Sequence, residues 1–281
     1  MRPDALAVLG LGVVGGSAAW AARSAEVPRV VGWSSSRADG TAALRVGAIH
    51  DLADRADRAV RGALMVLVAD APGPLGEVLR RVAGQIPENS PILLFSEVHS
   101  SALAVAASLG LADRTAALHP MGEVIGPGFH GATPDRFRGR IVYVSAADTH
   151  AGHRTARSAM SVIEEILGGA PVLIDPARHD EQVAWTRQLP DTAMVVLGHL
   201  LDGRGLGGVT WGAAAQLARQ GMPADPVAGS EVILANRVAV SAALEALAGD
   251  LDELRRLVSA DDAAGVRAFF EAAARFRPEA S

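Results

Sequence analysis

The chain has 281 residues, of which 49% are hydrophobic and 20% charged, and its formal net charge is −5. This composition supplies ample material for a buried core and excludes an intrinsically disordered chain. The negative charge argues against a nucleic-acid-binding protein, and no apolar run reaches the roughly 18 residues that a membrane span needs.

Two residue types are missing altogether, and each absence excludes a kind of chemistry. The chain has no cysteine, so disulfides and thiolate sites are excluded. All 26 basic residues are arginine, which excludes Schiff-base lysines, Walker lysines and dehydrogenases with a catalytic lysine. We see no clustered spacing of metal ligands and expect no metal. The N-terminus carries no secretion signal, and we therefore expect a cytoplasmic protein.

The first part of the chain alternates short apolar runs with helical segments. The runs are mostly continuous rather than alternating, which is typical of a parallel sheet covered on both faces. This succession predicts a doubly wound α/β domain over residues 1–174. The predicted strands are 5–9, 29–33, 64–68, 92–95, 116–118, 141–144 and 172–174. The predicted helices between them are 17–24, 75–83, 102–109 and 154–167.

After residue 174 the pattern changes to long amphipathic stretches. Helices are predicted over 179–201, 211–219, 230–248 and 251–276, with a cap at Asp261-Asp262 inside the last stretch. Residues 175–281 should therefore form an all-helical second domain. Its helices are too apolar to stand alone, so we expect a homodimer formed through this domain.

A glycine-rich turn follows the first predicted strand and opens a helix. Its sequence is Gly10-Leu11-Gly12-Val13-Val14-Gly15. Glycines allow a tight turn and a close approach of backbone N–H groups to a pyrophosphate, and the helix N-terminus adds partial positive charge. Directly after the first strand, this turn predicts a dinucleotide-binding Rossmann domain.

The end of the second strand bears on the choice of cofactor. An acidic residue there usually holds the ribose 2′-hydroxyl, but this chain reads Ser34-Ser35-Ser36-Arg37. Hydroxyls followed by a guanidinium suit a 2′-phosphate, so we favour NADP over NAD. The alternative is a serine-rich loop that contacts the ribose and tolerates both cofactors.

Two further loops follow predicted strands and carry candidate acid/base groups. One contains His99 and Ser100, and the other contains His119. Ligands in such sheets bind beyond the carboxyl ends of the strands, and an imidazole there can accept a proton from a substrate hydroxyl near neutral pH. His119 is the stronger candidate. His99 is either a second acid/base group or a residue that lines the pocket.

These residues together resemble the prephenate dehydrogenase family. The resemblance rests on the turn that starts at Gly10, on Leu118-His119-Pro120-Met121 and on His179-Asp180, and it continues through Asp225-Pro226 and Asn236-Arg237. It covers nearly the whole chain in order and spacing. It implies a Rossmann domain followed by a helical dimerisation domain, with NAD or NADP as the cofactor.

The resemblance also implies a reaction and roles for individual residues. The family carries out the oxidative decarboxylation of a cyclohexadienyl carboxylate, and its catalytic histidine and serine fall on His119 and Ser100. An arginine of the helical domain binds the substrate carboxylate there, and Arg219 is the nearest match. The spacing from Arg219 to Asp225-Pro226 is one residue longer than in the family.

Departures from the family pattern lie around the expected substrate pocket. Where the family reads Asp-x-Gly-Ser-x-Lys, this chain has His99 in place of the glycine and Ala102 in place of the lysine. Where many members read Ser-His-Leu-Pro-His, Gln188 and Asp191 replace the two imidazoles. An acid in place of an imidazole favours a substrate with an added amine. We therefore favour 4-amino-4-deoxyprephenate, converted to 4-aminophenylpyruvate, with prephenate and arogenate as alternatives.

A different class of function stays open beside these enzymes. A nucleotide-bound sensor would keep the glycine-rich turn and lose turnover. The missing imidazoles favour this alternative, whereas the retention of His119 and Ser100 disfavours it.

Overall fold

The computed structural model describes residues 3–69, 72–122, 128–202 and 225–276, together with residues 204, 212, 215 and 216. The chain divides into two compact units. The first comprises Met1–Val183 and Met222–Asn236, and the second comprises Ala184–Gly221 and Arg237–Ser281.

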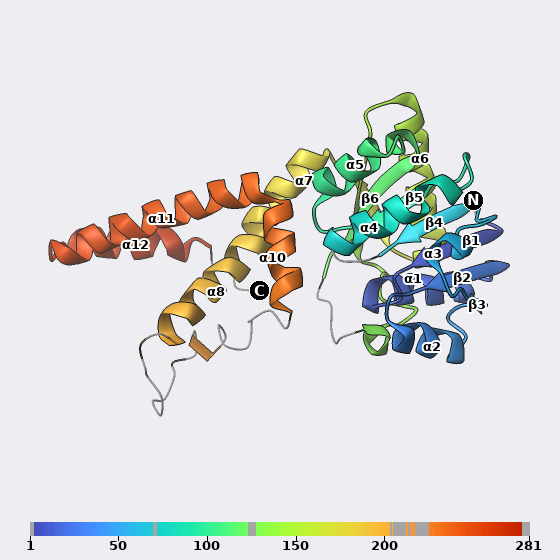
Figure 1. Ribbon diagram of the computed structural model, residues 1–281. Coiled ribbons are helices and arrows are strands. Elements are labelled where there is room, and N and C mark those ends of the chain that lie inside the picture. The colour runs from blue at the N-terminus through green and yellow to red at the C-terminus, as the bar shows by residue number, and fades with distance from the viewer. Residues whose placement is uncertain are drawn as a thin grey trace. The chain divides into compact units, whose positions relative to one another are not determined.

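The first unit is built on an eight-stranded sheet in the order β3-β2-β1-β4-β5-β6-β7-β8 (Figure 1). Neighbouring strands pair in parallel except β6 and β7, which are antiparallel. The strands are β1 (Ala5–Leu9), β2 (Arg29–Trp33), β3 (Asp51–Leu52), β4 (Met65–Val68), β5 (Ile92–Phe95), β6 (Thr115–Pro120), β7 (Ile141–Ala146) and β8 (Ala170–Leu173). The expected α/β class is confirmed, because β1 to β6 have the strand order of a Rossmann domain.

The last two strands correct the expectation of a wholly parallel sheet. A parallel return needs a long crossover, usually a helix. Among the described residues between β6 and β7, the only helix is the short 3-10 turn η3 (Gly128–Gly131), so β7 comes back antiparallel. The helix α6 (His150–Val162) then separates β7 from β8, and these two strands are again parallel.

Helices cover both faces of this sheet. On one face α1, α2, η3 and α6 share an apolar core with the strands, and on the other face α3, α4 and α5 share a second core. Every residue of β4 and β5 is buried, which accounts for their continuous apolar sequences. The helices are α1 (Val13–Ser24), α2 (Arg37–Arg45), α3 (Ala56–Ala59), α4 (Pro72–Val82), α5 (His99–Ser108), α6 (His150–Val162), α7 (Pro176–Val183) and α10 (Pro226–Ala235). Shorter helical turns are η1 (Ala83–Gln85), η2 (Ala112–Arg114) and the π-helical η4 (Ile163–Leu167).

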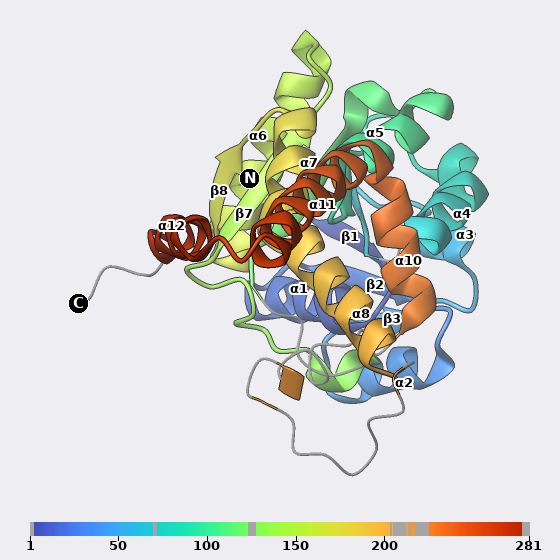
Figure 2. The same ribbon diagram turned by 90° about the vertical axis from the view of Figure 1, so that its left-hand side faces the viewer.

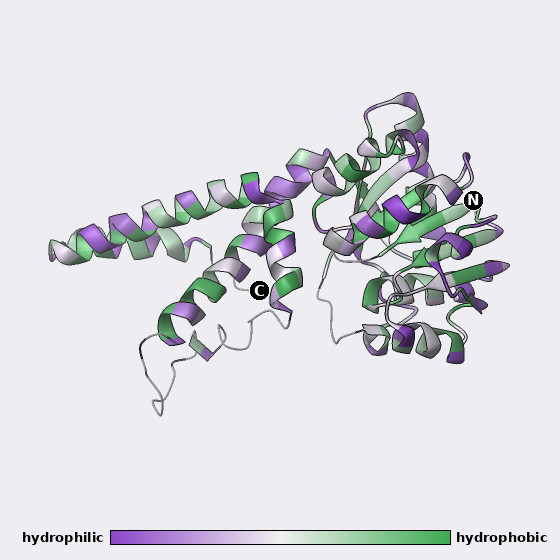
Figure 3. Ribbon diagram, in the orientation of Figure 1, coloured by the Kyte–Doolittle hydropathy of each residue, from purple (hydrophilic) through white to green (hydrophobic). Residues whose placement is uncertain are grey.

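The described part of the second unit is helical, as expected. It contains the π-helical turn η5 (Ala184–Gln188), α8 (Leu189–Asp202), α11 (Arg237–Ser259) and α12 (Ala263–Ala274). Within it α11 packs against α8, η5 and α12 (Figure 2). Hydrophobic and hydrophilic residues alternate along α11, as Figure 3 shows. The expected cap is present, because the Asp262 carboxylate accepts a hydrogen bond from Gly265 N.

Two long helices expected from the sequence are interrupted. The stretch 230–248 breaks at Asn236, between α10 and α11, and the stretch 251–276 breaks between α11 and α12. Most of the helix expected over 211–219 lies outside the described residues. In the part of the chain that is described, no single helix is long and apolar enough to cross a membrane, although α10 and α11 taken together as a bent pair pass that test.

Candidate active site

The glycine-rich turn after β1 has the geometry of an anion-binding loop. Gly10 has a φ of 88°, in the left-handed region that glycine adopts freely. A Cβ at Gly15 would clash with the carbonyl oxygen of Gly10 and with Ala69, whereas a Cβ at Gly12 would meet no atom within 4 Å. The glycine at position 15 is therefore required by packing, while the backbone at Gly12 borders open space that a ligand can enter.

The start of α1 leaves its backbone donors available to such a ligand. Gly12 is the N-cap and offers no side chain to the first turn, which also contains no acidic residue. The first N–H groups of a helix have no partner within the helix, and its N-terminus carries partial positive charge. Together with Val13 and Val14, this turn can therefore hold a phosphate group.

The serine-rich segment after β2 forms the start of α2. Ser36 Oγ accepts a hydrogen bond from Asp39 N at 3.2 Å, and Ser34 Oγ accepts one from Ser36 N at 3.2 Å. The Asp39 carboxylate accepts a hydrogen bond from Phe129 N at 2.8 Å and so fastens η3 to α2. Ser35 and Arg37 are exposed, which makes Arg37 the charged group of this segment that a ligand can recruit.

Three imidazoles meet at the carboxyl ends of β5 and β6. His119 lies near the end of β6, His99 is the first residue of α5, and His179 comes from α7. The helices α5 and α7 pack against each other (Figure 1). His119 Nδ1 is 3.0 Å from His179 Nε2. The rings of His99 and His179 are stacked with their centroids 3.7 Å apart and an angle of 8° between their planes. His99 and His179 are fully buried, and His119 is 8% exposed.

Asp180 joins this cluster to the start of α5. Its Oδ1 accepts hydrogen bonds from His179 Nδ1 at 2.9 Å and from His99 N at 2.7 Å, and its Oδ2 accepts one from Ser100 N at 2.8 Å. The backbone carbonyl of Asp180 accepts a hydrogen bond from Asn236 Nδ2 at 2.8 Å. The carboxylate therefore satisfies backbone donors of α5 and orients an imidazole at the same time.

Charge in this cluster is set by burial and hydrogen bonding. Burial alone would raise the pKa of Asp180, but hydrogen bonds from His179, Ser100 and the α5 backbone hold that pKa below its usual value. Burial, together with the nearby imidazoles of His179 and His119, lowers the pKa of His99 well below its usual value. The cluster therefore holds an ionised carboxylate beside a neutral His99 at neutral pH.

The side chain of His99 is hydrogen-bonded to a residue of β7. Its Nδ1 lies 2.7 Å from Ser145 Oγ, which donates a hydrogen bond to the carbonyl oxygen of Ile174 at 2.8 Å. The single hydroxyl proton of Ser145 is thus used, and Ser145 must accept from His99 Nδ1. Among the described residues, the buried Nε2 of His99 has no hydrogen-bond partner.

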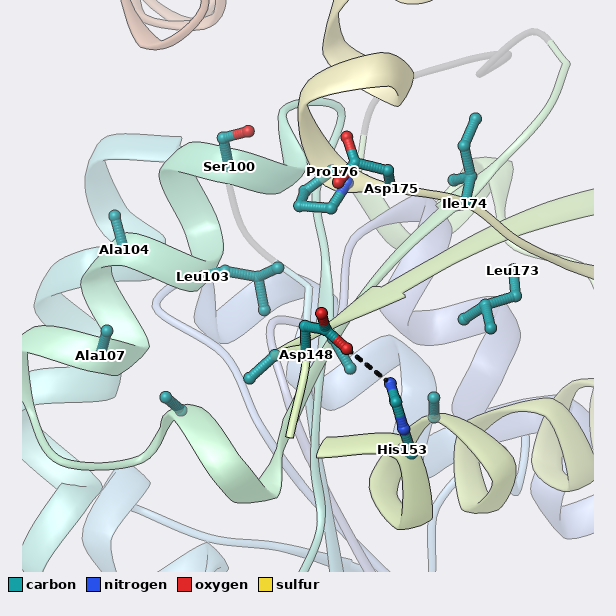
Figure 4. Close-up of a pocket in the computed structure, with 14 residues that line it drawn as sticks. Ser100, Leu103, Ala104, Ala107, Asp148, His153, Leu173, Ile174, Asp175 and Pro176 are labelled. Carbon is teal, nitrogen blue, oxygen red and sulfur yellow. Dashed lines mark ion pairs between the residues drawn. The ribbon is translucent and has the colours of Figure 1, made fainter. Parts of the chain in front are cut away.

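A cavity of about 710 Å³ lies elsewhere in the first unit, between α5, the start of α6 and the start of α7 (Figure 4). Its lining is mostly alanine and leucine, with Ser100 and Asp175 at one end and an exposed ion pair between His153 Nε2 and Asp148 Oδ1 at 3.1 Å. None of the three clustered imidazoles lines it. Ser100 is the one residue common to this cavity and to the contacts of Asp180.

The remaining candidate residues are distributed as follows. Gln188 is buried in η5 and Asp191 is exposed in the first turn of α8, both within the second unit. Arg219 lies outside the described residues. In the described ranges no group of three or more His, Asp or Glu side chains is arranged to hold a metal ion.

The sequence did not point to Ser145 as part of the site. The signal that could have identified it is a single serine in an otherwise apolar run. In the structure its side chain is fully buried there. Asn236 was noted only for its spacing. The structure shows that its amide holds the backbone of Asp180.

Solved structures with the same architecture include two dehydrogenases. A prephenate dehydrogenase from Aquifex aeolicus, in complex with hydroxyphenyl propionate and NAD+, is similar with a TM-score of 0.86 and 16% identity over 97% of this chain and 96% of that one. The arogenate dehydrogenase of Synechocystis is similar with a TM-score of 0.77 and 18% identity over 95% and 96%. The fold is that of the prephenate and arogenate dehydrogenases.

More distant folds and sequence comparisons add a contrast. A (S)-3-hydroxybutyryl-CoA dehydrogenase from Ralstonia eutropha reaches a TM-score of 0.52 at 15% identity over 71% of this chain and 73% of that one. No protein-family model and no curated protein matches the chain in sequence. The expected resemblance to prephenate dehydrogenases is thus confirmed at the level of the fold, over nearly the full length of both chains.

Proposed function

We propose that this protein is an NAD(P)-dependent dehydrogenase of the prephenate type, acting on a cyclohexadienyl carboxylate. The observation that carries the proposal is the buried cluster in which His119 is hydrogen-bonded to His179 and, through it, to Asp180. An oriented imidazole at the carboxyl end of a Rossmann strand suits acid/base work on a ring substituent. The full-length likeness in fold to prephenate and arogenate dehydrogenases supports the substrate class.

The nucleotide would bind at the turn after β1. The open space at Gly12, the uncapped start of α1 and the packing of Gly15 fit the pyrophosphate of a dinucleotide. When bound, the nicotinamide supplies the acceptor for the hydride. Arg37 would contact a 2′-phosphate, which is why we propose NADP as the preferred cofactor, with NAD as the alternative.

In the proposed reaction His119 accepts the hydrogen bond of the substituent on the ring carbon that loses hydride. As that carbon loses its hydride, the substituent becomes more acidic, and His119 can take its proton and return it later. The ring carboxylate leaves as carbon dioxide, and the electrons of the broken carbon–carbon bond complete the aromatic ring. No net proton is released, so His119 ends the cycle in its starting state.

The finer proposal is that the substrate is 4-amino-4-deoxyprephenate and the product 4-aminophenylpyruvate. It rests on the pocket departures, above all on Asp191, an exposed carboxylate where many prephenate dehydrogenases have an imidazole. A carboxylate attracts an amine-bearing substrate and repels one that carries only carboxylates. Ser100, His99, Gln188 and Arg219 are the other residues that we propose to act in catalysis or in substrate binding.

The test is the formation of NAD(P)H by purified protein, with 4-amino-4-deoxyprephenate, prephenate and arogenate each offered with NAD and with NADP. Turnover of the amino compound alone would support the finer proposal. Turnover of prephenate or arogenate alone would contradict it while upholding the dehydrogenase. Nucleotide binding without turnover of any of the three would contradict the enzyme and favour a nucleotide-bound sensor.

Cofactor preference has a separate test in Arg37→Ser. Removing a guanidinium that binds a phosphate should weaken NADP binding by about tenfold and leave NAD binding unchanged, because a charge-assisted hydrogen bond contributes about that much. Arg45→Ser, at the exposed far end of the same helix, is the matched control. Equal losses for both nucleotides in Arg37→Ser would contradict the NADP preference.

A further inference from the structure

We infer that Asp180 and His179 are positioning residues that act in series on His119, fixing its neutral ring with the proton on Nδ1 and the acceptor lone pair on Nε2. The inference deepens the proposed function and rests on it for its catalytic meaning. Its geometric content, the state of one imidazole, is independent of any substrate.

The direction of the hydrogen bonds follows from the carboxylate. Asp180 is ionised and can only accept, so His179 Nδ1 must donate to its Oδ1 at 2.9 Å. In a neutral imidazole the other nitrogen is then an acceptor. His179 Nε2 lies 3.0 Å from His119 Nδ1, and therefore His119 Nδ1 is the donor of that bond. This leaves Nε2 as the basic nitrogen of His119.

His119 Nδ1 is the donor when His179 is neutral, and the surroundings of His179 disfavour a second charge. His179 is fully buried, and its ring is stacked on that of His99 with 3.7 Å between the centroids. The ring of Tyr143 packs against it in a T-shaped arrangement, with 5.5 Å between the centroids. The carboxylate of Asp180 already accepts two backbone hydrogen bonds from α5 in addition to that of His179. A second charge in this apolar stack would lose its hydration.

His99 contributes to the same end. Ser145 accepts from its Nδ1, so His99 also carries its proton on Nδ1, and burial keeps the ring neutral. A neutral ring stacked on His179 adds no positive charge. The stacking also fixes the plane of the His179 ring, whose Nε2 lies next to His119 Nδ1. The family that the sequence resembles has a glycine at this position, so the stacked platform is a feature of this chain.

The arrangement serves His119 in both of its charge states. When His119 takes a proton on Nε2, its Nδ1–H still donates to His179, and the charge of Asp180 stabilises the new cation through the intervening ring. The reverse arrangement, with a cationic His179 donating to His119, would place the proton of His119 on Nε2. A base of that form could not accept a proton from a substrate.

The decisive experiment is a long-range 1H–15N spectrum of protein labelled with 15N-histidine, free of substrate, which reports which nitrogen of each imidazole carries the proton. The chain has eight histidines, and the spectrum of His119→Asn identifies the signals of His119. We expect His119 protonated on Nδ1 in the wild type. A His119 protonated on Nε2 would overturn the inference whatever the enzyme does.

Two variants test whether the effect passes through His179. His179→Phe keeps a ring against His99 but removes both nitrogens, and Asp180→Asn removes the charge while keeping an acceptor for α5. In each, the Nε2–H form of His119 should become populated. The matched control is Asp148→Asn at the exposed pair with His153, where the His119 signals should not change. Unchanged His119 signals in well-folded His179→Phe protein would overturn the inference.

Kinetics connect the same variants to the reaction. With the substrate that the wild type turns over, kcat of His179→Phe should fall by about 100-fold with little change in KM, within the range of general base catalysis. The acidic limb of its pH profile should move to lower pH, because the cation on His119 loses its partner. If the wild type turns over none of the substrates but its His119 is protonated on Nδ1, the proposed function fails and the positioning inference stands. A KM effect with unchanged kcat would contradict the positioning role.

Discussion

Two histidine–aspartate pairs among the described residues of the first unit have similar geometry and opposite character. His179 and Asp180 are 2.9 Å apart with exposed side-chain fractions of 0% and 6%, whereas His153 and Asp148 are 3.1 Å apart with fractions of 53% and 100%. The buried pair is held by further hydrogen bonds to α5 and to His119, and the exposed pair borders an open cavity. Distance alone therefore does not distinguish a buried, connected pair from a surface contact, but burial and further hydrogen bonds do.

The physical reason lies in the solvent. Water screens the exposed pair, and holding its side chains in one geometry costs conformational entropy, so such pairs contribute little to stability. The buried carboxylate cannot return to water, and each of its hydrogen bonds fixes a neighbour in place. The largest differences between the two pairs should appear when one partner, or the group that it serves, is removed.

The first and largest effect concerns His119. Replacing it with Asn should lower kcat by about 1,000-fold, because general acid–base groups contribute between about 10² and 10⁴. NAD(P) affinity, measured by calorimetry, should stay the same. His153→Asn is the control and should retain full activity. A nucleotide-binding protein whose output survives His119→Asn is not the enzyme that we propose.

The second effect is on stability, measured by urea unfolding at pH 7. Asp180→Asn should lower the free energy of unfolding by about 3 kcal/mol, because it removes the charged partner of buried donors. Asp148→Asn should leave the unfolding midpoint unchanged. Since the pKa of Asp180 is lowered in the folded state, its contribution is present above about pH 4 and is lost as the pH falls through the folded-state value. The difference between the two variants should therefore shrink in acid. Equal losses at pH 7 would contradict the comparison.

The sequence predicted much of this fold for reasons that are local. Continuous apolar runs marked β4 and β5 because both faces of those strands are buried, and the glycine-rich turn marked the start of α1. The break of the expected helix 230–248 at Asn236 was not predictable in that way. The Asn236 amide holds the backbone of Asp180, which is 56 residues away in the chain.

The same limit applies to the site. His119 and the pair His179-Asp180 were noted for their order along the chain, yet their contact spans 60 residues and depends on how α7 packs against α5. Ser145 was missed because a single serine in an apolar run does not change the prediction of a strand. Its buried hydroxyl nevertheless orients His99. Residue types and spacing can nominate a site, but the hydrogen-bond directions within it come only from tertiary packing.

The smallest effect concerns His99 and separates burial from charge within the cluster itself. The pKa of His99 is lowered in the folded state. At pH values between that folded-state pKa and about 6.5, His99 therefore binds a proton in the unfolded chain but not in the folded one. His99 therefore opposes acid stability: its own contribution should lower the unfolding free energy by up to about 1.4 kcal/mol per pH unit as the pH falls below 6.5, and by nothing above it. His99→Phe keeps a ring that can stack on His179 and removes the titration, so the slope of stability between pH 6.5 and 5 should flatten. His150→Phe, an exposed histidine at the start of α6, is the control and should keep the wild-type slope. A slope that persists in His99→Phe would mean that the fold does not lower the pKa of His99. That result would contradict the neutral His99 ring that we infer to be stacked on His179.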